Sequence, residues 1–294
     1  MAITERKAGK SISDVFIYLS MWVVVAITLY PFIYVLSMSI SEPQYVVDGS
    51  VWLYPKGFSL SSYRTVFVDK QIWIAYYNTV FYTVVGSLLS VTFTMLAAFP
   101  LSRRDFFARN WIMAIIVITM FFGGGLIPSY LLIQELGLYD TRWAILLPGL
   151  TGAFYIIITR TFLQSIPDSL SESAKIDGAN DIRILRSIIL PLSKPILAVL
   201  TLFFAVGYWN SYFSALIYLS DVNKQPVSLF LVKVLVQNQD LLRERMASSQ
   251  LEQGFLSVQL KYALIIIVIL PILIVYPFLQ KYFVKGVMIG SLKE

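Results

Sequence analysis

Six apolar segments, each long enough to cross a lipid bilayer, follow one another along this chain of 294 residues. A transmembrane helix needs about 20 predominantly apolar residues. Because this length recurs along the whole sequence, we expect an all-α integral membrane protein with six transmembrane helices. The expected spans are residues 15–40, 74–101, 111–133, 143–162, 196–220 and 262–283.

The composition excludes several kinds of chemistry. Hydrophobic residues make up 57% of the chain and charged residues only 14%, whereas a soluble domain is about 25% charged. We therefore expect one polytopic membrane domain over residues 15–283, an N-terminal segment 1–14 and a tail 284–294. Cysteine and histidine are both absent, so thiolate chemistry and the commonest general base and metal ligand are missing. We expect neither an enzyme nor a metal site.

Basic residues orient the expected helices. Of the 23 Lys and Arg residues, 14 fall on the side that holds both termini and the loops after the second and fourth spans. Cytoplasmic loops carry the excess of Lys and Arg. The prediction is therefore a multi-pass protein of the cytoplasmic membrane with both termini in the cytoplasm. No run of basic residues indicates nucleic-acid binding.

Glycine and proline interrupt several spans. Residues 123–128 hold three consecutive glycines and Pro128, which makes this the expected site of a functional helix break. Broken helices line pathways in transporters. The alternative is close helix packing with tolerated kinks, which Gly and Pro also serve in membranes.

A polar loop of about residues 163–195 separates the fourth and fifth spans. Its charges cannot lie in hydrocarbon. Pro167 and nearby acidic residues favour a helix start, Gly178 a sharp turn, and Asn180 or Asp181 the cap of a second helix. Two interpretations stay open on these residues alone: a surface loop packed on its own bundle, or a docking site that displays Glu172 and a face of small residues.

The same loop resembles the cytoplasmic EAA loop of ABC-importer permeases. The residues that carry the resemblance are Glu172, Ala174, Asp177, Gly178, Ala179, Ile188, Leu190, Pro191 and Pro195, with Ser173 in place of the usual second Ala. The resemblance implies a coupling helix that seats in a cleft of an ATP-hydrolysing subunit. It assigns the contact with that subunit to Glu172, Ser173, Ala174, Asp177, Gly178 and Ala179.

Further segments resemble the carbohydrate branch of that family, maltose-type permeases included. Residues 52–63 look like its P-x-G-F-S-x-x-x-Y stretch, and residues 124–130 and 147–149 resemble the branch linked to oligosaccharides from polysaccharide breakdown. The tail is similar to a peptide that reaches between the two ATPases of maltose-type systems. That likeness implies ATPase contacts for Gly290, Ser291, Leu292 and Lys293.

Candidate substrate contacts lie near the middle of the fifth span. A sugar needs aromatic faces and hydroxyl or amide partners, which Tyr208, Trp209, Asn210 and Tyr212 supply, together with Asn78 in the second span. An amide at membrane depth marks either a pathway or a helix–helix hydrogen bond. For Asn78 the packing alternative is favoured.

We therefore expect one transmembrane subunit of a bacterial ABC importer for a carbohydrate, in particular an oligosaccharide from polysaccharide breakdown, acidic oligosaccharides included. The resemblance implies a second homologous permease subunit, two ATP-binding subunits that hold ATP and Mg, and an extracytoplasmic solute-binding protein. This chain itself is expected to bind no cofactor. The alternatives are an ABC permease for a non-sugar solute and an ion-coupled secondary transporter, which would need carboxylates deep within its spans.

Overall fold

The computed structural model describes residues 12–236, 258–275 and 277. Within these residues the chain is helical and has no β-strand, apart from an isolated bridge between Ser41 and Phe58. The all-α class is thus confirmed. Three expected features lie wholly or partly outside the described residues: the N-terminal segment 1–14, the end of the sixth span and the tail 284–294.

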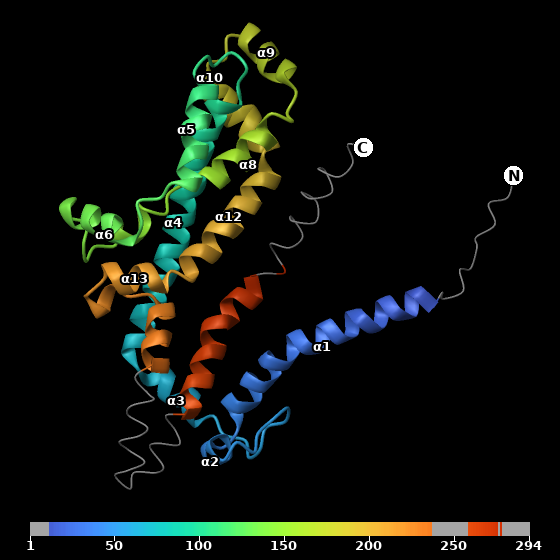
Figure 1. Cartoon of the computed structure of the whole chain (residues 1–294), viewed down its shortest axis with the longest axis vertical. Coiled ribbons are helices and arrows are strands. Elements are labelled where there is room, and N and C mark those ends of the chain that lie inside the picture. The colour runs from blue at the N-terminus through green and yellow to red at the C-terminus, as the bar shows by residue number, and fades with distance from the viewer. Residues whose placement is uncertain (1–11, 237–257, 276, 278–294) are drawn as a thin grey trace, which may run out of the picture. The chain divides into compact units, whose positions relative to one another are not determined.

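The chain divides into two compact units. The first contains α1 (Ile12–Ile40), α2 (Pro43–Val47), α3 (Ser61–Val68) and the beginning of a C-terminal helix, Val258–Val275. Figure 1 shows the end of α1 leading directly into α2. The first unit has a small apolar core of Met38, Val46 and Val51, against which Tyr34, Val258 and Tyr262 pack.

One buried glutamine joins the first unit together. The Gln259 Nε2 donates hydrogen bonds to the carbonyl oxygens of Ser39 (3.1 Å) and Ser41, and its Oε1 accepts from the hydroxyls of Ser61 (3.3 Å) and Ser62 (2.7 Å). Unpaired buried backbone groups are costly. This side chain therefore stabilises the end of α1 and the start of α3 at the same time.

The second unit is built along α4 (Lys70–Ser102), a helix of 33 residues. The helices α8 (Ala153–Leu163) and α12 (Lys194–Trp209) pack along it, as Figure 1 shows. Small and polar residues on α4, including Gly86, Ser90 and Thr94, are buried at these contacts. Small residues let helix backbones approach closely within a bilayer.

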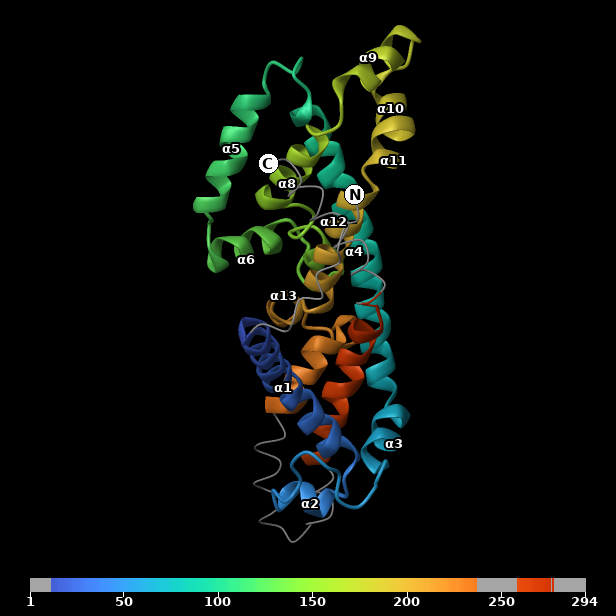
Figure 2. The same ribbon diagram turned by 90° about the vertical axis from the view of Figure 1, so that its right-hand side faces the viewer.

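Helix α5 (Arg109–Phe121) and helix α6 (Leu126–Glu135) take the place of one continuous third span. The two helices are bent by 115° at the break, and Gly125 has a left-handed backbone with φ of 82°. Figure 2 shows α6 leaving the end of α5 at this sharp angle. The break predicted at residues 123–128 is therefore confirmed.

The fourth and fifth expected spans are interrupted as well. In the fourth, α7 (Trp143–Leu146) is separated from α8 by a non-helical stretch that ends at Gly152. In the fifth, α12 is followed after Asn210 and Ser211 by α13 (Tyr212–Tyr218). Within the described residues, three helices are long and apolar enough to span a membrane unbroken, and bent pairs raise the number to five. The sixth span stays an expectation.

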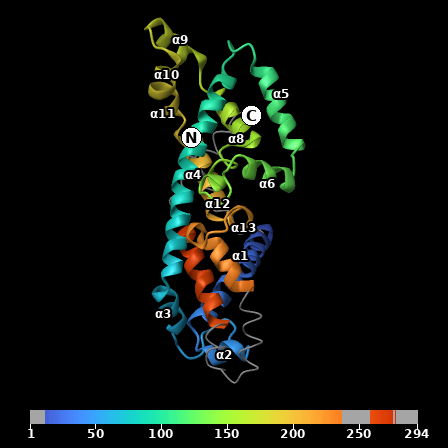
Figure 3. The same ribbon diagram turned by 90° about the vertical axis from the view of Figure 1, so that its left-hand side faces the viewer.

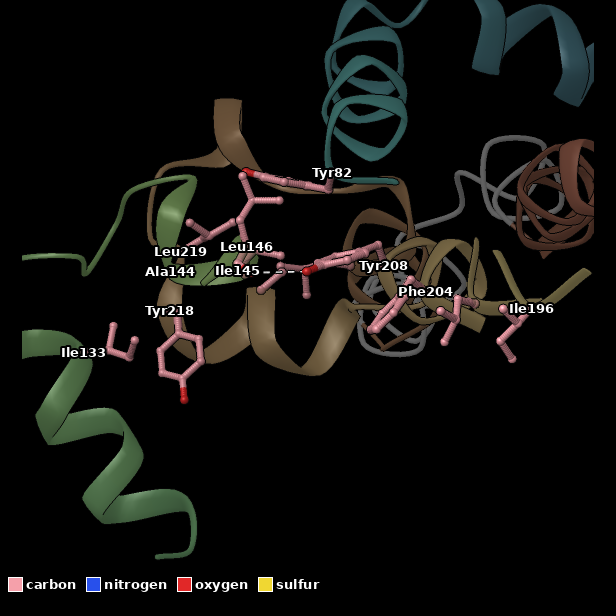
Figure 4. Packing of buried hydrophobic residues seen from close by; sticks show 13 residues of the cluster. Tyr82, Ile133, Ala144, Ile145, Leu146, Ile196, Phe204, Tyr208, Tyr218 and Leu219 are labelled. Atoms are coloured by element: carbon pink, nitrogen blue, oxygen red, sulfur yellow. Dashed lines mark hydrogen bonds between the residues drawn. The ribbon is translucent and has the colours of Figure 1, made fainter. Parts of the chain in front are cut away.

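Tyr208 joins the fourth and fifth segments to α4. Its hydroxyl donates to the carbonyl of Leu146 at 3.1 Å and lies 3.1 Å from Ser90 Oγ, as Figure 4 shows for the Leu146 bond. Ser90 Oγ in turn donates to the carbonyl of Gly149 at 3.3 Å. Irregular backbone at membrane depth is tolerated only where protein groups satisfy it. The hydroxyls of Tyr208 and Ser90 donate the hydrogen bonds that these backbone carbonyls need beside the break between α7 and α8.

Gly86 makes room for the Tyr208 ring. A Cβ atom at Gly86 would lie 2.6 Å from two ring carbons of Tyr208, whereas a Cβ at Gly207 would meet nothing within 4 Å. We expect Gly86→Ala to overpack this contact and to destabilise the protein by about 1–3 kcal/mol. Thermal unfolding in detergent should show a lower midpoint.

Gly207→Ala is the matched control, because it adds the same methyl group to a helical glycine of α12 in open space. This variant should unfold at or above the wild-type temperature, since Ala favours a helix by about 0.5–1 kcal/mol over Gly. Equal midpoints for the two variants would contradict the assigned role of Gly86.

Candidate coupling surface and translocation cavity

Local sequence chemistry shapes the first half of the polar loop. Helix α9 (Asp168–Ile176) begins directly after Pro167, which cannot continue a preceding helix. Gly178 has φ of 80° and ends the helix. The N–H of Ala179 donates to the carbonyl of Ala174 and that of Gly178 to the carbonyl of Lys175. This is a Schellman turn, which requires a left-handed residue such as glycine.

The second half of the loop is a helix with an irregular middle. Asn180 caps α10 (Asp181–Ile184), because its Oδ1 accepts from the N–H of Arg183 at 2.9 Å. A π-helical turn, Leu185–Ile189, precedes α11 (Leu190–Leu192). Pro191 cannot donate to the preceding turn. The run then bends by 82° into α12, so the loop forms the predicted helix, turn and second helix.

The predicted coupling residues divide between an exposed and a half-buried face. Glu172, Ser173, Asp177 and Gly178 are exposed. The charged residues Asp168 and Lys175 of α9 form ion pairs with Arg104 and Asp105, and neither forms an ion pair with the Glu172 carboxylate. Ala174 and Ala179 are half-buried and pack against a core cluster of the second unit. The two alanines therefore fix α9 to the bundle, while the exposed residues remain free to meet another surface.

Three exposed apolar side chains accompany these residues. Ile176 is 87% exposed and Ile182 77%, and Leu170 is also exposed. Exposed apolar side chains gathered on a polar loop mark an interaction surface. These residues were not predicted from the sequence, although an isoleucine in the last turn of a short polar helix is the signal that could have identified Ile176.

Two ion pairs connect α9 to the loop between α4 and α5. Arg104 Nε lies 3.4 Å from Asp168 Oδ2, and Lys175 Nζ lies 3.0 Å from Asp105 Oδ2. Figure 3 shows α9 and this loop at the same end of α4. The hydrogen bond from Lys175 holds the pKa of Asp105 below its usual value. The pair thus contributes stability at neutral pH and loses it as the pH falls through the lowered pKa.

A cavity of about 330 Å³ lies beside Tyr208 within the second unit. Aromatic rings and hydroxyl groups line it together. The ring centroids of Tyr155 and Phe204 lie 4.4 Å apart with the ring planes tilted by 45°. Tyr208 and Ser211 also line the cavity. The Ser211 Oγ is buried and has no hydrogen-bond partner among the described residues. The complete lining is Ala144, Ile145, Pro148, Gly149, Tyr155, Phe203, Phe204, Gly207, Tyr208, Ser211 and Ser214.

The predicted substrate residues of the fifth segment do not all reach this cavity. Tyr208 lines it, whereas Trp209 is buried and lines a separate apolar pocket, where its Nε1 donates to the carbonyl of Val268 at 3.3 Å. Asn210 and Tyr212 are exposed, and the Asn210 amide donates to the carbonyl of Val206. The cavity is also lined by Tyr155, Phe203 and Ser214. These three residues lie outside the Tyr208–Tyr212 segment and were not predicted from the sequence.

Asn78 is fully buried within a hydrogen-bond network. Its Nδ2 donates to the carbonyls of Asn223 (2.7 Å) and Gln225 (3.2 Å), and its Oδ1 accepts from Arg142 Nη2 (3.0 Å). All these partners belong to the loops that follow α6 and α13. The bonding agrees with the packing alternative for Asn78, because no polar atom of its amide is left to meet a substrate.

Asp140 links the same two loops. It has a left-handed backbone with φ of 56°, a conformation that Asp tolerates better than most residues. Its Oδ1 accepts from the N–H groups of Ser220 (3.1 Å) and Asp221 (2.9 Å), and Lys224 Nζ donates to its carbonyl at 2.7 Å. The Asp221 N–H holds the pKa of the Asp140 carboxyl below its usual value. The Asp140 carboxyl is therefore ionised at neutral pH and links the two loops as a carboxylate.

Gly290, Ser291, Leu292 and Lys293 lie outside the described residues. Among the residues that the structure describes, no group of three or more Asp and Glu side chains could hold a metal ion.

The structure combines apolar helices with broken spans, an exposed helix–turn–helix and a cavity lined by aromatic and hydroxyl groups. This combination is typical of a solute permease. The chain belongs to the family of binding-protein-dependent transport system inner membrane components, whose family model matches residues 90–289. It is therefore a translocation subunit of an ABC transport system and not an enzyme. The resemblance noted in the sequence is confirmed.

Relatives of known name cover nearly the whole chain. The polygalacturonan/rhamnogalacturonan transport system permease protein YtcP of Bacillus subtilis is 40% identical, over 95% of this chain and 98% of the relative. Protein LplC of the same organism is 40% identical, over 98% and 97%. A crystal structure of a bacterial ABC transporter involved in the import of the acidic polysaccharide alginate matches with a TM-score of 0.86 and 39% identity, over 93% and 98%.

The ion pair between Asp105 and Lys175 can be tested by exchanging its charges. Asp105→Lys or Lys175→Asp alone should place like charges together and loosen α9. An exposed pair is worth about 0.2–1 kcal/mol, so hydrogen exchange of the α9 amides should rise roughly threefold. The double variant should return exchange toward the wild-type rate. Exchange that stays fast in the double variant would show that the pair does not hold α9.

Proposed function

We propose that this chain is one of two transmembrane subunits of a bacterial ABC importer for acidic oligosaccharides. The chain would work beside a homologous permease subunit, two ATP-binding subunits and an extracytoplasmic binding protein. It would lie in the cytoplasmic membrane with six spans and with α9 on the cytoplasmic side. The excess of basic residues on that side supports this orientation.

The cavity beside Tyr208 is the observation that carries the substrate proposal. Sugars bind through their CH faces on aromatic rings and through hydroxyl hydrogen bonds. Tyr155, Phe203 and Tyr208 offer rings, while Ser211 and Ser214 offer hydroxyls. The Ser211 hydroxyl has no hydrogen-bond partner in the described part of the chain, which leaves it available to a sugar hydroxyl.

An acidic sugar would need a positive charge elsewhere in the assembly. None of the residues that line the cavity is charged. The relatives that are named for pectin-type polymers and alginate nonetheless support acidic substrates. We therefore assign the neutralising charge to the homologous permease subunit or to the binding protein.

The mechanical input would enter through α9. Closure of the two ATP-binding subunits would draw their clefts together and carry the exposed face of α9 with them. Ala174 and Ala179 pack against the core under the turn, and α11 leads into α12 without an intervening loop. Movement of α9 would therefore reach α12 and the cavity beside Tyr208.

A secondary transporter driven by an ion gradient is a weaker alternative. Such transporters carry ionisable groups deep in their spans. Among the described residues, none of the buried polar side chains is an Asp or a Glu. A permease for a non-sugar solute would predict a cavity with charged or purely apolar walls in place of mixed aromatic and hydroxyl groups.

Glu172→Lys tests the coupling role. The variant should insert normally, because the side chain is exposed. In the assembled transporter it should lose sugar uptake and the ATP hydrolysis that substrate stimulates. Glu135→Lys, which makes the same charge change at the exposed end of α6, should retain both. Uptake at the wild-type rate in Glu172→Lys would refute the role.

Tyr155→Leu tests the sugar cavity. The substitution keeps an apolar side chain but removes the aromatic face, which is worth roughly 1 kcal/mol, or about fivefold in affinity. The KM for uptake of an acidic oligosaccharide should rise by that factor. Phe154→Leu is the matched control, since Phe154 is the neighbouring residue on α8 and is exposed outside the cavity. An unchanged KM in Tyr155→Leu would remove this cavity from the pathway.

A further inference from the structure

We propose that the loop between α2 and α3 anchors the protein in the lipid–water interface of the outer leaflet. The anchor consists of Trp52, Tyr54 and Phe58, with Lys56 beside them, and we call residues 52–58 the aromatic loop. The leaflet assignment rests on the orientation given under the proposed function. The anchor itself rests on the geometry of the first unit.

No described part of the chain covers the aromatic side chains of this loop. Trp52 is 68% exposed, Tyr54 81% and Phe58 74%. All seven residues 52–58 are exposed, whereas Val51, directly before them, is buried in the core of the first unit. Three large aromatic rings that are exposed together indicate an interaction surface.

Backbone hydrogen bonds hold the aromatic loop against the end of α1. The N–H of Glu42 donates to the carbonyls of Lys56 (3.0 Å) and Gly57 (2.7 Å), and the N–H of Ser59 donates to the carbonyl of Ile40 (2.9 Å). Gly57 has φ of 59°, and a Cβ there would lie 2.7 Å from Glu42 Oε2. The rings are therefore presented from a fixed backbone.

The depth of the loop follows from its contact with α1. Large apolar side chains of α1 are exposed from Val15 to Leu36, a length of roughly 32 Å at the helical rise. This length matches the hydrocarbon core of a bilayer, about 30 Å. The next residue, Ser37, donates through its Oγ to the carbonyl of Leu53 at 2.7 Å. Leu53 therefore lies at the edge of the hydrocarbon, and Trp52 and Tyr54 flank it.

This depth and composition favour lipid over the other occupants. Trp and Tyr concentrate at the membrane–water interface, where an apolar ring and a polar group are both satisfied. Lys56 can meet anionic headgroups. A protein partner also buries Trp and Tyr, but side chains that start at the hydrocarbon edge meet lipid first. A sugar would need several polar partners, and residues 52–58 offer one polar group on each of Trp52, Tyr54 and Lys56.

The absence of cysteine allows a clean test with spin labels. A label at Leu53→Cys reports the aromatic loop, and a label at Asp48→Cys, on the exposed turn after α2, is the control. In vesicles of phosphatidylethanolamine and phosphatidylglycerol, the label at position 53 should collide more with oxygen and less with a water-soluble nickel chelate than the label at position 48. Power-saturation EPR measures both collision rates.

Removal of the rings should lift the loop from the interface. In the Trp52→Ser/Tyr54→Ser background, the nickel accessibility of the label at position 53 should move to the value of the control label. The thermal midpoint in detergent should stay unchanged, because both rings are exposed. The anchor is overturned if position 53 is already as accessible to nickel as position 48 with both rings present, or if it becomes shielded only when a binding protein is added.

Topology is measured separately on the same Asp48→Cys variant. A membrane-impermeant thiol reagent added to intact cells or spheroplasts should label it. Failure of that labelling overturns the proposed orientation and the outer-leaflet assignment together. Successful labelling combined with a nickel-accessible position 53 overturns the anchor alone and leaves the importer proposal intact.

Discussion

The second unit depends on one contact, the Tyr208 ring against Gly86. This contact lets α12 approach α4 closely, and it brings the Tyr208 hydroxyl to Ser90 and to the carbonyl of Leu146. Without these bonds the non-helical stretch after α7 would leave carbonyls unpaired at membrane depth, at a cost of several kcal/mol each. The same ring forms a wall of the cavity. Tyr208 therefore packs α12 against α4, donates a hydrogen bond to the backbone beside the break and forms part of the cavity wall.

The coupling surface and the cavity are joined by continuous structure. Core residues under α9 also contact Met95 and Ala98 of α4, and the helical run after Asn180 continues through the 82° bend into α12. A short helix held at both ends by ion pairs and by packed alanines can transmit displacement as a body. Exposed ion pairs alone are too weak for this, at about 0–1 kcal/mol, so the buried contacts of Ala174 and Ala179 carry most of the connection.

The sequence predicted the local features whose chemistry is contained in a few adjacent residues. The break at Gly123–Gly125, the turn at Gly178 and the cap at Asn180 each depend on a backbone conformation or a short-range bond. Features that depend on distant residues were not foreseen. The cavity joins Tyr155 to Ser214, and the Asn78 network joins α4 to loops beyond residue 140. Apolar periodicity also did not separate α7 from α8, because apolar residues continue on both sides of the stretch between them. Pro148, Gly149 and Gly152 are the local signal of that interruption.

The Gln259 side chain has a consequence for the order of biosynthesis. It bonds to serines near residues 40 and 60, about two hundred positions earlier in the chain. The ribosome must therefore release Gln259 before the first unit can close, although α1 enters the membrane at the start of translation. Until then the carbonyls at the end of α1 need water or an insertion factor as a substitute partner. Nascent chains arrested before this glutamine should accordingly hold an inserted first helix beside an unfinished first unit.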